Sequence, residues 1–275
     1  MAASALNPRI RLPAVAGLFY PSDRKELDGM LASLLSDDAG PQAVKAVVAP
    51  HAGYKYSGAV AGQVFARIEI PERVAILGPN HRGIGPDFAV FPPGVWKTPI
   101  GDATIDERLT RQLLDGIQRA RSDESAHLEE HSVEVEVNFM LKRRPDVRLA
   151  CVVVGDLTLA QAQEVGDQLA SAVRSFDHAV LLVASTDLSH FLADAEARKR
   201  DRRAIDAILA LDEAELWRRV VTEDISMCGY IPTAIVMRAA KALGATCADL
   251  AAYATSADAS GDTHRVVGYA GVLLN

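Results

Sequence analysis

The sequence predicts an α/β protein with three layers (α/β/α), in which helices cover both faces of a largely parallel central sheet. Three observations support this class. Short apolar runs rich in β-branched residues recur along the chain, helical patterns separate them, and several runs stop abruptly at turn residues. Strands that alternate with helices in this way are typical of parallel sheets that are covered on both sides.

Length and composition favour one domain over residues 1–275. A chain of 275 residues is within the range of a single large α/β domain, and no low-complexity or Ser/Pro-rich stretch offers a linker. Apolar residues make up 49% and charged residues 24% of the chain, which excludes wholesale disorder. The chain can therefore bury a sizeable core.

Charge and hydropathy narrow the partners that we expect. The chain carries 36 acidic and 29 basic residues, a formal charge of -7, whereas nucleic-acid-binding surfaces are basic. The longest apolar runs are far shorter than the roughly 20 residues that cross a bilayer. The first residues also lack the apolar segment of an export signal. We expect a cytoplasmic protein with no nucleic-acid or membrane partner.

The first half of the chain begins with an extended segment, residues 11–20, and continues as alternating helices and strands. Asp23, with Glu26 three residues later, predicts the start of a helix. Ser57 and Asp106 are expected to cap two further helices. The expected strands of this half are residues 44–49, 73–77 and 88–91 and a short segment at Trp96.

The second half of the chain also alternates between predicted helices and strands. Asp212 is a candidate cap for one of its helices. Residues 256–262 are rich in turn formers. The expected strands are residues 149–154, 179–184, 248–254 and 266–274, and the expected helices lie within residues 133–141, 159–169, 195–209, 213–221 and 234–243.

Polar residues follow three of the predicted strands at the point where each strand ends. His51 and His81 follow the strands at 44–49 and 73–77, and Asp187 and His190 follow the strand at 179–184. Ligands of open α/β sheets bind outside the carboxyl ends of the strands, so these side chains are expected to meet. One histidine alone is more often structural than a ligand. A competing interpretation is that Asp187 and His190 only cap the next helix, with Asp187 accepting from main-chain N–H groups.

The three cysteines form no CxxC pair, which favours a reducing compartment over a disulfide framework. Cys151 and Cys247 lie in or beside apolar runs and are expected to be buried. Cys228 precedes a predicted helix, whose N-terminus favours a thiolate.

Proteins hold non-haem Fe(II) with two imidazoles and an anionic third ligand, and they leave other coordination positions of the metal open. Either Asp187 or the thiolate of Cys228 can supply the anion. A thiolate favours iron, copper or zinc over a metal that takes only oxygen ligands. A remaining histidine can act as general base or orient a ligand. The other histidines, His127, His178 and His264, are expected at the surface.

With these residues in place, the chain resembles the Memo family, whose bacterial and archaeal members are called AmmeMemoRadiSam system protein B. The matching segments keep the family order over nearly the whole chain, and together they are highly specific. They are residues 13–21 (Pro-Ala-Val-Ala-Gly-Leu-Phe-Tyr-Pro), 49–54 (Ala-Pro-His-Ala-Gly-Tyr), 77–81 (Leu-Gly-Pro-Asn-His), 130–134 (Glu-His-Ser-Val-Glu), 185–190 (Ser-Thr-Asp-Leu-Ser-His), 228–229 (Cys-Gly) and 266–271 (Val-Val-Gly-Tyr-Ala-Gly).

The resemblance implies a fold similar to that of class III extradiol dioxygenases, which are non-haem iron enzymes. It implies that His51, His81 and Cys228 are the metal ligands. Asp187 and His190 would lie beside them as catalytic groups, and His131 of the Glu-His-Ser motif would line the crevice. The dioxygenases have a carboxylate where this family has a cysteine, which argues against ring cleavage itself because a thiolate is easily oxidised.

Two functions follow from the resemblance. The first is a dioxygenase-like oxidoreductase that uses iron, with copper or zinc as the other candidate metals, and acts on a small molecule or peptide. Radical-SAM and companion proteins of the same system would be its partners. The alternative is an interaction module that binds a peptide or metal ion in the same crevice without turnover. Whether the protein is an enzyme is open at this point, because fold alone does not decide function.

Overall fold

The structure is a computed structural model that describes residues 9–36 and 40–275. Its centre is a twelve-stranded sheet with the order β1-β5-β6-β8-β3-β9-β2-β12-β10, to which β11 adds at β12, β4 at β8 and β7 at β4. The strands are β1 (Arg9–Arg11), β2 (Ala46–Ala49), β3 (Arg73–Pro79), β4 (Phe88–Val90), β5 (Gly94–Thr98), β6 (Gly101–Ile105), β7 (Arg121–Ser122), β8 (Arg148–Val154), β9 (Val180–Ser185), β10 (His190–Leu192), β11 (Ala248–Thr255) and β12 (Val266–Leu274).

The four central strands β8, β3, β9 and β2 are all parallel. In their register Ile76 of β3 pairs with Cys151 of β8 on one side and with Val183 of β9 on the other. The last strand, β12, joins antiparallel to β2. The carboxyl ends of β3, β9 and β2 consequently lie side by side at one edge of the sheet.

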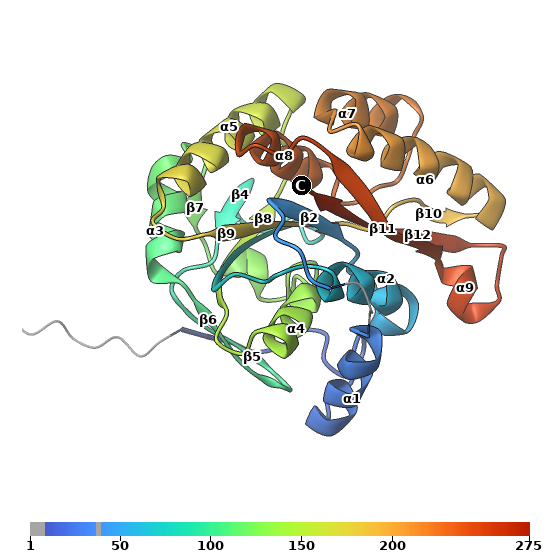
Figure 1. The fold of residues 1–275 in the computed structure, drawn as a ribbon, viewed down its shortest axis with the longest axis horizontal. Helices are drawn as coiled ribbons and strands as arrows, with labels where there is room; N and C mark the ends of the chain where they lie inside the picture. The colour runs from blue at the N-terminus through green and yellow to red at the C-terminus, as the bar shows by residue number, and fades with distance from the viewer. Residues whose placement is uncertain (1–8, 37–39) are drawn as a thin grey trace, which may run out of the picture.

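Helices cover both faces of the sheet, which confirms the predicted three-layer α/β class (Figure 1). Alternate residues of β2 mark the two cores: Val47 packs in one cluster with Val64 and Phe139, and Val48 packs in the other with Ile235. Helices α1, α2 and α4 cover the first face; α3, α5, α6, α7 and α8 cover the second. The helices are α1 (Arg24–Leu34), α2 (Tyr54–Ala66), α3 (Glu107–Gly116), α4 (Glu134–Arg143), α5 (Leu159–Ser175), α6 (Asp194–Leu209), α7 (Glu213–Thr222), α8 (Tyr230–Ala242) and α9 (Ser256–Ser260), with a 3₁₀ turn at Ser125–His127.

Three of the predicted helix caps are confirmed. The side chains of Asp23, Asp106 and Asp212 each accept a hydrogen bond from the main-chain N–H three residues later. Each carboxylate thus satisfies one of the free N–H groups of a helix start.

The predicted cap at Ser57 is wrong, because α2 begins at Tyr54 with Gly53 as its cap residue. Ser57 lies one turn inside the helix, and its hydroxyl donates to the carbonyl of Ala52 at 2.8 Å. Helix α2 therefore begins three residues after His51, closer along the chain than the predicted cap at Ser57 indicates.

Two boundaries near the C-terminus also differ from the prediction. Helix α8 begins at Tyr230, four residues before the predicted start at residue 234, and it includes Pro232. Proline is tolerated there because N–H groups of the first turn have no partner within the helix. The turn-rich residues 256–262 contain α9, which Thr255 and Asp258 start with a capping box.

Among residues 9–36 and 40–275, no helix is both long and apolar enough to cross a membrane. The N-terminal strand β1 and the C-terminal strand β12 belong to the same sheet. That residues 1–275 form a single domain remains a prediction.

Candidate metal centre

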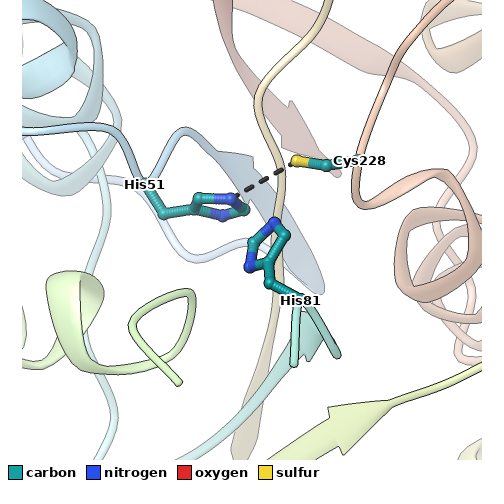
Figure 2. Close-up of side chains that lie close together, drawn as sticks. All are labelled: His51, His81 and Cys228. Carbon is teal, nitrogen blue, oxygen red and sulfur yellow. Dashed lines mark hydrogen bonds between the residues drawn. The ribbon is translucent and has the colours of Figure 1, made fainter. Parts of the chain in front are cut away.

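Three side chains from separate segments meet at the carboxyl edge of the sheet. His51 follows β2, His81 follows β3, and Cys228 precedes α8. One ligand atom of each lies within 4.8 Å of the others. The Nε2 atom of His51 is 3.4 Å from Sγ of Cys228, and Figure 2 shows the His81 ring directed toward both. His51 is buried, whereas His81 is exposed, so the group opens to solvent on the His81 side.

This spacing fits a shared metal ion. Nitrogen and sulfur ligands bind transition metals at about 2.0 to 2.3 Å, which places neighbouring ligand atoms roughly 3.5 Å apart around the ion. The separation of 3.4 Å between His51 and Cys228 already has this size. Two imidazoles and a thiol are a donor set for iron, copper or zinc. The residues present therefore fit a metal of this group.

Glu130 fixes the orientation of His81. One carboxylate oxygen of Glu130 accepts from Nδ1 of His81 at 2.8 Å, and the other accepts from the His81 main-chain N–H at 2.7 Å. Burial alone would raise the pKa of Glu130, but the hydrogen bond and charge of His81, together with the N–H of Ser132, lower this pKa to about 2. With Nδ1 donating to a carboxylate, Nε2 of His81 is free to bind a metal.

His51 is held on both its ring and its main chain. Its Nδ1 atom is 2.8 Å from Oγ of Ser185, and its main-chain N–H donates to Asp187 at 2.9 Å. Burial lowers the pKa of His51 well below its ordinary value, and the neighbouring imidazoles of His131 and His81 lower it further. His51 is thus a neutral imidazole, which is the form that binds metal ions.

Cys228 lies directly before α8, as the sequence predicts, but its thiol is not acidic. Burial raises its pKa to about 12, and the carboxylate of Asp187 acts in the same direction. The N–H of Asp187 points at Sγ from 3.3 Å and only partly offsets this. The N–H of Gly229 at the start of α8 also lowers the pKa, as the position before a helix predicts, but burial outweighs it. A bound cation would be needed to displace the proton.

A glycine allows Cys228 to come this close to the sheet. A Cβ atom on Gly229 would lie 2.4 Å from the carbonyl oxygen of Ser185 and 2.6 Å from the side chain of Thr186. The N–H of Gly229 donates to the Thr186 hydroxyl at 2.9 Å. The turn that carries the thiol therefore packs directly on the end of β9.

The other three predicted site residues surround this group. The ring of His131 lies 5.4 Å from that of His51 and stacks on that of His81 at 4.7 Å, between ring centroids. Asp187 accepts from the N–H of His51, and the charge of His190 acts on Asp187. Nδ1 of His190 is 2.8 Å from the Ser226 carbonyl, which leaves its Nε2 atom for other partners.

Burial also changes the acidity of two of these groups. It lowers the pKa of His131 to about 4 and raises that of Asp187 to about 6. The competing interpretation, in which Asp187 and His190 cap the next helix, is wrong, because α6 begins at Asp194 after Ala193. His190 lies in β10, and Asp187 accepts from the N–H groups of His51 and Ala52 instead.

The remaining cysteines and histidines lie away from the candidate metal centre. Cys151 is buried as predicted, but Cys247 is exposed, so its predicted burial is wrong. His178 and His264 are exposed as predicted. His127 is fully buried, which contradicts its expected place at the surface.

Residue patterns alone did not single out Glu130, Ser185 or Glu136 as parts of the site. Glu130 lies 49 residues from His81 in the chain, and Ser185 lies 134 residues from His51. The signal for Glu130 was present: a buried carboxylate next to a histidine motif is a frequent partner of a metal-binding imidazole. Ser185 directly follows the predicted strand at 179–184, so the strand-end rule could have found it. Glu136 lies where polar and apolar residues alternate and gives no such signal.

The fold and the site define an α/β protein with a candidate metal centre of two histidines and one cysteine at the carboxyl edge of its sheet. A family model described as Memo-like protein matches residues 11–273. The chain belongs to this Memo-like family, as the resemblance implied.

Relatives agree with this assignment over nearly their full length. A MEMO1 family protein of Aquifex aeolicus is 39% identical over 268 residues, covering 97% of this chain and 99% of the relative. MEMO1 family protein MK0963 of Methanopyrus kandleri is 40% identical over 278 residues, covering 96% and 98%.

A solved structure is similar in fold. The crystal structure of the uncharacterized protein JW3007 from Escherichia coli K12 matches with a TM-score of 0.54, covering 84% of this chain and 100% of that chain. The sequence identity is 11%, so this likeness concerns the fold alone.

Proposed function

We propose that this Memo-family protein is a metal-dependent oxidoreductase that holds iron between His51, His81 and Cys228. The observation that carries the proposal is the convergence of two neutral or carboxylate-oriented imidazoles and a thiol within 4.8 Å of one another. This set leaves coordination positions open, and the exposed side of His81 gives a small molecule or peptide access to them. Copper or zinc would suit the same donors.

A bound redox metal would supply electron transfer and activation of a small oxidant. The protein's own groups would orient the substrate and move protons. Asp187 accepts from the main-chain N–H of His51, and the ring of His131 lies 5.4 Å from that of His51 between centroids. Nδ1 of His190 donates to the Ser226 carbonyl, so in the neutral ring Nε2 holds the lone pair and is the atom that would accept a proton.

A second function, binding of a peptide without turnover, is favoured by apolar side chains beside the centre. Phe191, adjacent to His190, is 63% exposed, and Leu18 is 81% exposed. Leu18 is next to Phe19, whose ring contacts that of His131. Exposed apolar groups around a polar centre are typical of surfaces that bind partners.

Anaerobic purification without added metal salts, followed by metal analysis and oxygen-consumption assays with catechol-like and other small substrates, separates the two functions. Stoichiometric iron with oxygen-dependent turnover supports the oxidoreductase. Stoichiometric metal without turnover, together with tight peptide binding, supports the binding module and contradicts the enzyme.

Single-residue variants test the ligand set. His51→Ala and Cys228→Ser each remove one direct ligand, so metal affinity should fall by at least about 100-fold while the fold is retained. Cys247→Ser is the matched control, because Cys247 is exposed and away from the candidate metal centre. Metal affinity of the control should not change. Unchanged metal content in His51→Ala or Cys228→Ser would remove that residue from the ligand set.

A further inference from the structure

Behind His51, away from the metal side, the hydroxyl of Ser185 has three polar neighbours. Nδ1 of His51 is 2.8 Å from Oγ, the carbonyl oxygen of Ser132 is 2.7 Å away, and a carboxyl oxygen of Glu136 is 2.9 Å away. All four residues are buried. These contacts form a chain from Glu136 through Ser185 to His51.

The number of protons available determines which group donates in each of these hydrogen bonds. A serine hydroxyl has one proton to donate and two lone pairs that accept. The carbonyl of Ser132 can only accept, so it takes the hydroxyl proton of Ser185. Both other contacts then have to donate to Ser185: His51 through an N–H at Nδ1, and Glu136 through an O–H. Any other arrangement leaves two acceptors facing each other within 3 Å in a buried site.

The surroundings of Glu136 agree with a neutral acid. Its side chain is fully buried, and its second carboxyl oxygen has no hydrogen-bond partner within the described residues. Burial raises the pKa of Glu136 well above its ordinary value, and the nearby charge of Asp187 adds to this shift. A Ser185 hydroxyl that donated to Glu136 would lower the pKa, but the one proton of this hydroxyl goes to the Ser132 carbonyl. An ionised carboxylate here would be a buried charge that no cationic side chain among the described residues offsets, which is costly.

We propose that Glu136 is a neutral carboxylic acid that donates a hydrogen bond to Ser185. The hydrogen bonds from Glu136 through Ser185 to His51 then keep the proton of His51 on Nδ1, so that the lone pair of Nε2 faces Cys228. Glu136 is thus a positioning residue, which acts on the metal centre through two hydrogen bonds. The part that concerns metal affinity rests on the proposed function. The protonation states of Glu136 and His51 do not.

The proposal is tested first on the wild-type, metal-free protein. ¹⁵N NMR of histidine-labelled protein, with His51 assigned from His51→Ala, should give a neutral ring protonated at Nδ1. ¹³C NMR of glutamate-labelled protein, with Glu136 assigned from Glu136→Gln, should give a protonated carboxyl group near neutral pH. A proton on Nε2 of His51, or an ionised Glu136, would overturn the proposal whatever the protein does with metals.

Metal affinity gives the second test. Glu136→Gln keeps a donor of the same shape, so the affinity for Fe(II) should remain within about threefold of wild type. Glu136→Ala removes the donor and should weaken Fe(II) binding by about 10- to 100-fold, as loss of a residue behind a metal ligand does. Equal affinities in Gln and Ala variants that are both folded by circular dichroism would contradict the positioning role. If the wild type itself binds no metal, the proposed function fails, and the NMR result still decides the protonation states.

Discussion

His127 differs more than any other histidine from what its sequence neighbourhood indicates. Its ring packs edge-on against Phe91 and Trp96, at 5.3 and 5.8 Å between centroids. Its Nε2 atom is 3.2 Å from the carbonyl of Ala89, whereas buried Nδ1 has no partner within the described ranges. Burial, with a contribution from the nearby charge of Arg11, lowers the pKa of His127 from 6.5 to about 3.

This burial predicts a loss of stability in mild acid. Below about pH 6.5 the unfolded chain binds a proton at this histidine and the folded chain does not, so the free energy of unfolding falls by up to about 1.4 kcal/mol per pH unit. His127→Asn, which cannot be protonated, should show a shallower fall between about pH 7 and about pH 5 in urea unfolding. His178→Asn, at an exposed position, is the control. Equal slopes in wild type and His127→Asn would contradict the prediction.

Individual site residues could be predicted from the sequence only where a local rule applied. His51, His81, Asp187 and His190 were found because each follows an apolar strand, and a parallel sheet brings such strand ends together. Cys228, by contrast, was one of two candidates for the third ligand, and only the family resemblance favoured it over Asp187. Its thiol lies 177 residues from His51 along the chain, and no local pattern reports that contact. The acidity of a thiol also depends on burial, which the position before a helix does not reveal.

At the scale of elements, caps and glycines decide how closely segments approach. The three aspartate caps were predicted correctly because a carboxylate and the N–H three residues later act locally. The start of α2 was predicted wrongly because Gly53 gives no side-chain signal. Its position depends on tertiary contact, since the N–H of Tyr54 donates to the carbonyl of Phe19 at 2.7 Å.

The turn at Gly229 gives a prediction at this scale. In Gly229→Ala the added methyl group would meet the backbone of β9, so the Cys228 turn must shift away from the sheet. We expect a loss of about 1 to 3 kcal/mol in the free energy of unfolding and weaker metal binding. Both are measurable by urea unfolding and by metal titration.

Gly29→Ala is the matched control for this variant. A Cβ atom at Gly29 has no heavy atom within 4 Å other than those of its own helix, α1. Replacing glycine by alanine in a helix is stabilising by up to about 1 kcal/mol. If Gly229→Ala behaved like Gly29→Ala, close packing of this turn would not be what positions the thiol.

At the scale of the whole molecule, the N-terminal segment is tied to the site through Arg11 of β1. Its guanidinium group donates to the carbonyls of His127 and Glu130, at 2.8 and 2.7 Å, and to the carboxylate of Glu134 at 2.6 Å. The group also lies 4.1 Å from the centre of the Trp96 ring. An edge strand therefore holds the segment that carries Glu130 and His131.

Removing the Arg11 side chain should lower the stability of the protein strongly. Arg11→Ala leaves the buried carboxylate of Glu134 without its cation, which typically costs about 3 to 5 kcal/mol in the free energy of unfolding. Arg9→Ala is the control: Arg9 pairs with Glu124 in solvent, with exposed side-chain fractions of 56% and 38%, and such pairs contribute about 0 to 1 kcal/mol. Thermal unfolding of the two variants side by side measures the difference. Equal losses would contradict the anchoring role of Arg11.

The fold class could be predicted from the sequence, but the order of the strands in the sheet could not. Alternation of apolar runs and helical patterns predicted the three layers, because both faces of a parallel sheet have to be covered. The strand order was not predictable, since β9 lies between β3 and β2 although it follows both in the chain. That order depends on packing over the whole sheet.

The strand order has a consequence for how this scaffold can diversify. His51 and His81 extend from strands that are separated by one intervening strand, or roughly 10 Å. The last residue of that middle strand, Ser185, contacts Nδ1 of His51 at 2.8 Å, and the two rings approach to 5.2 Å between centroids. The two histidines therefore follow strands of the central sheet, whereas Cys228 lies in the turn before α8. A substitution at position 228 would therefore change the third candidate ligand without changing the strands that carry the two histidines.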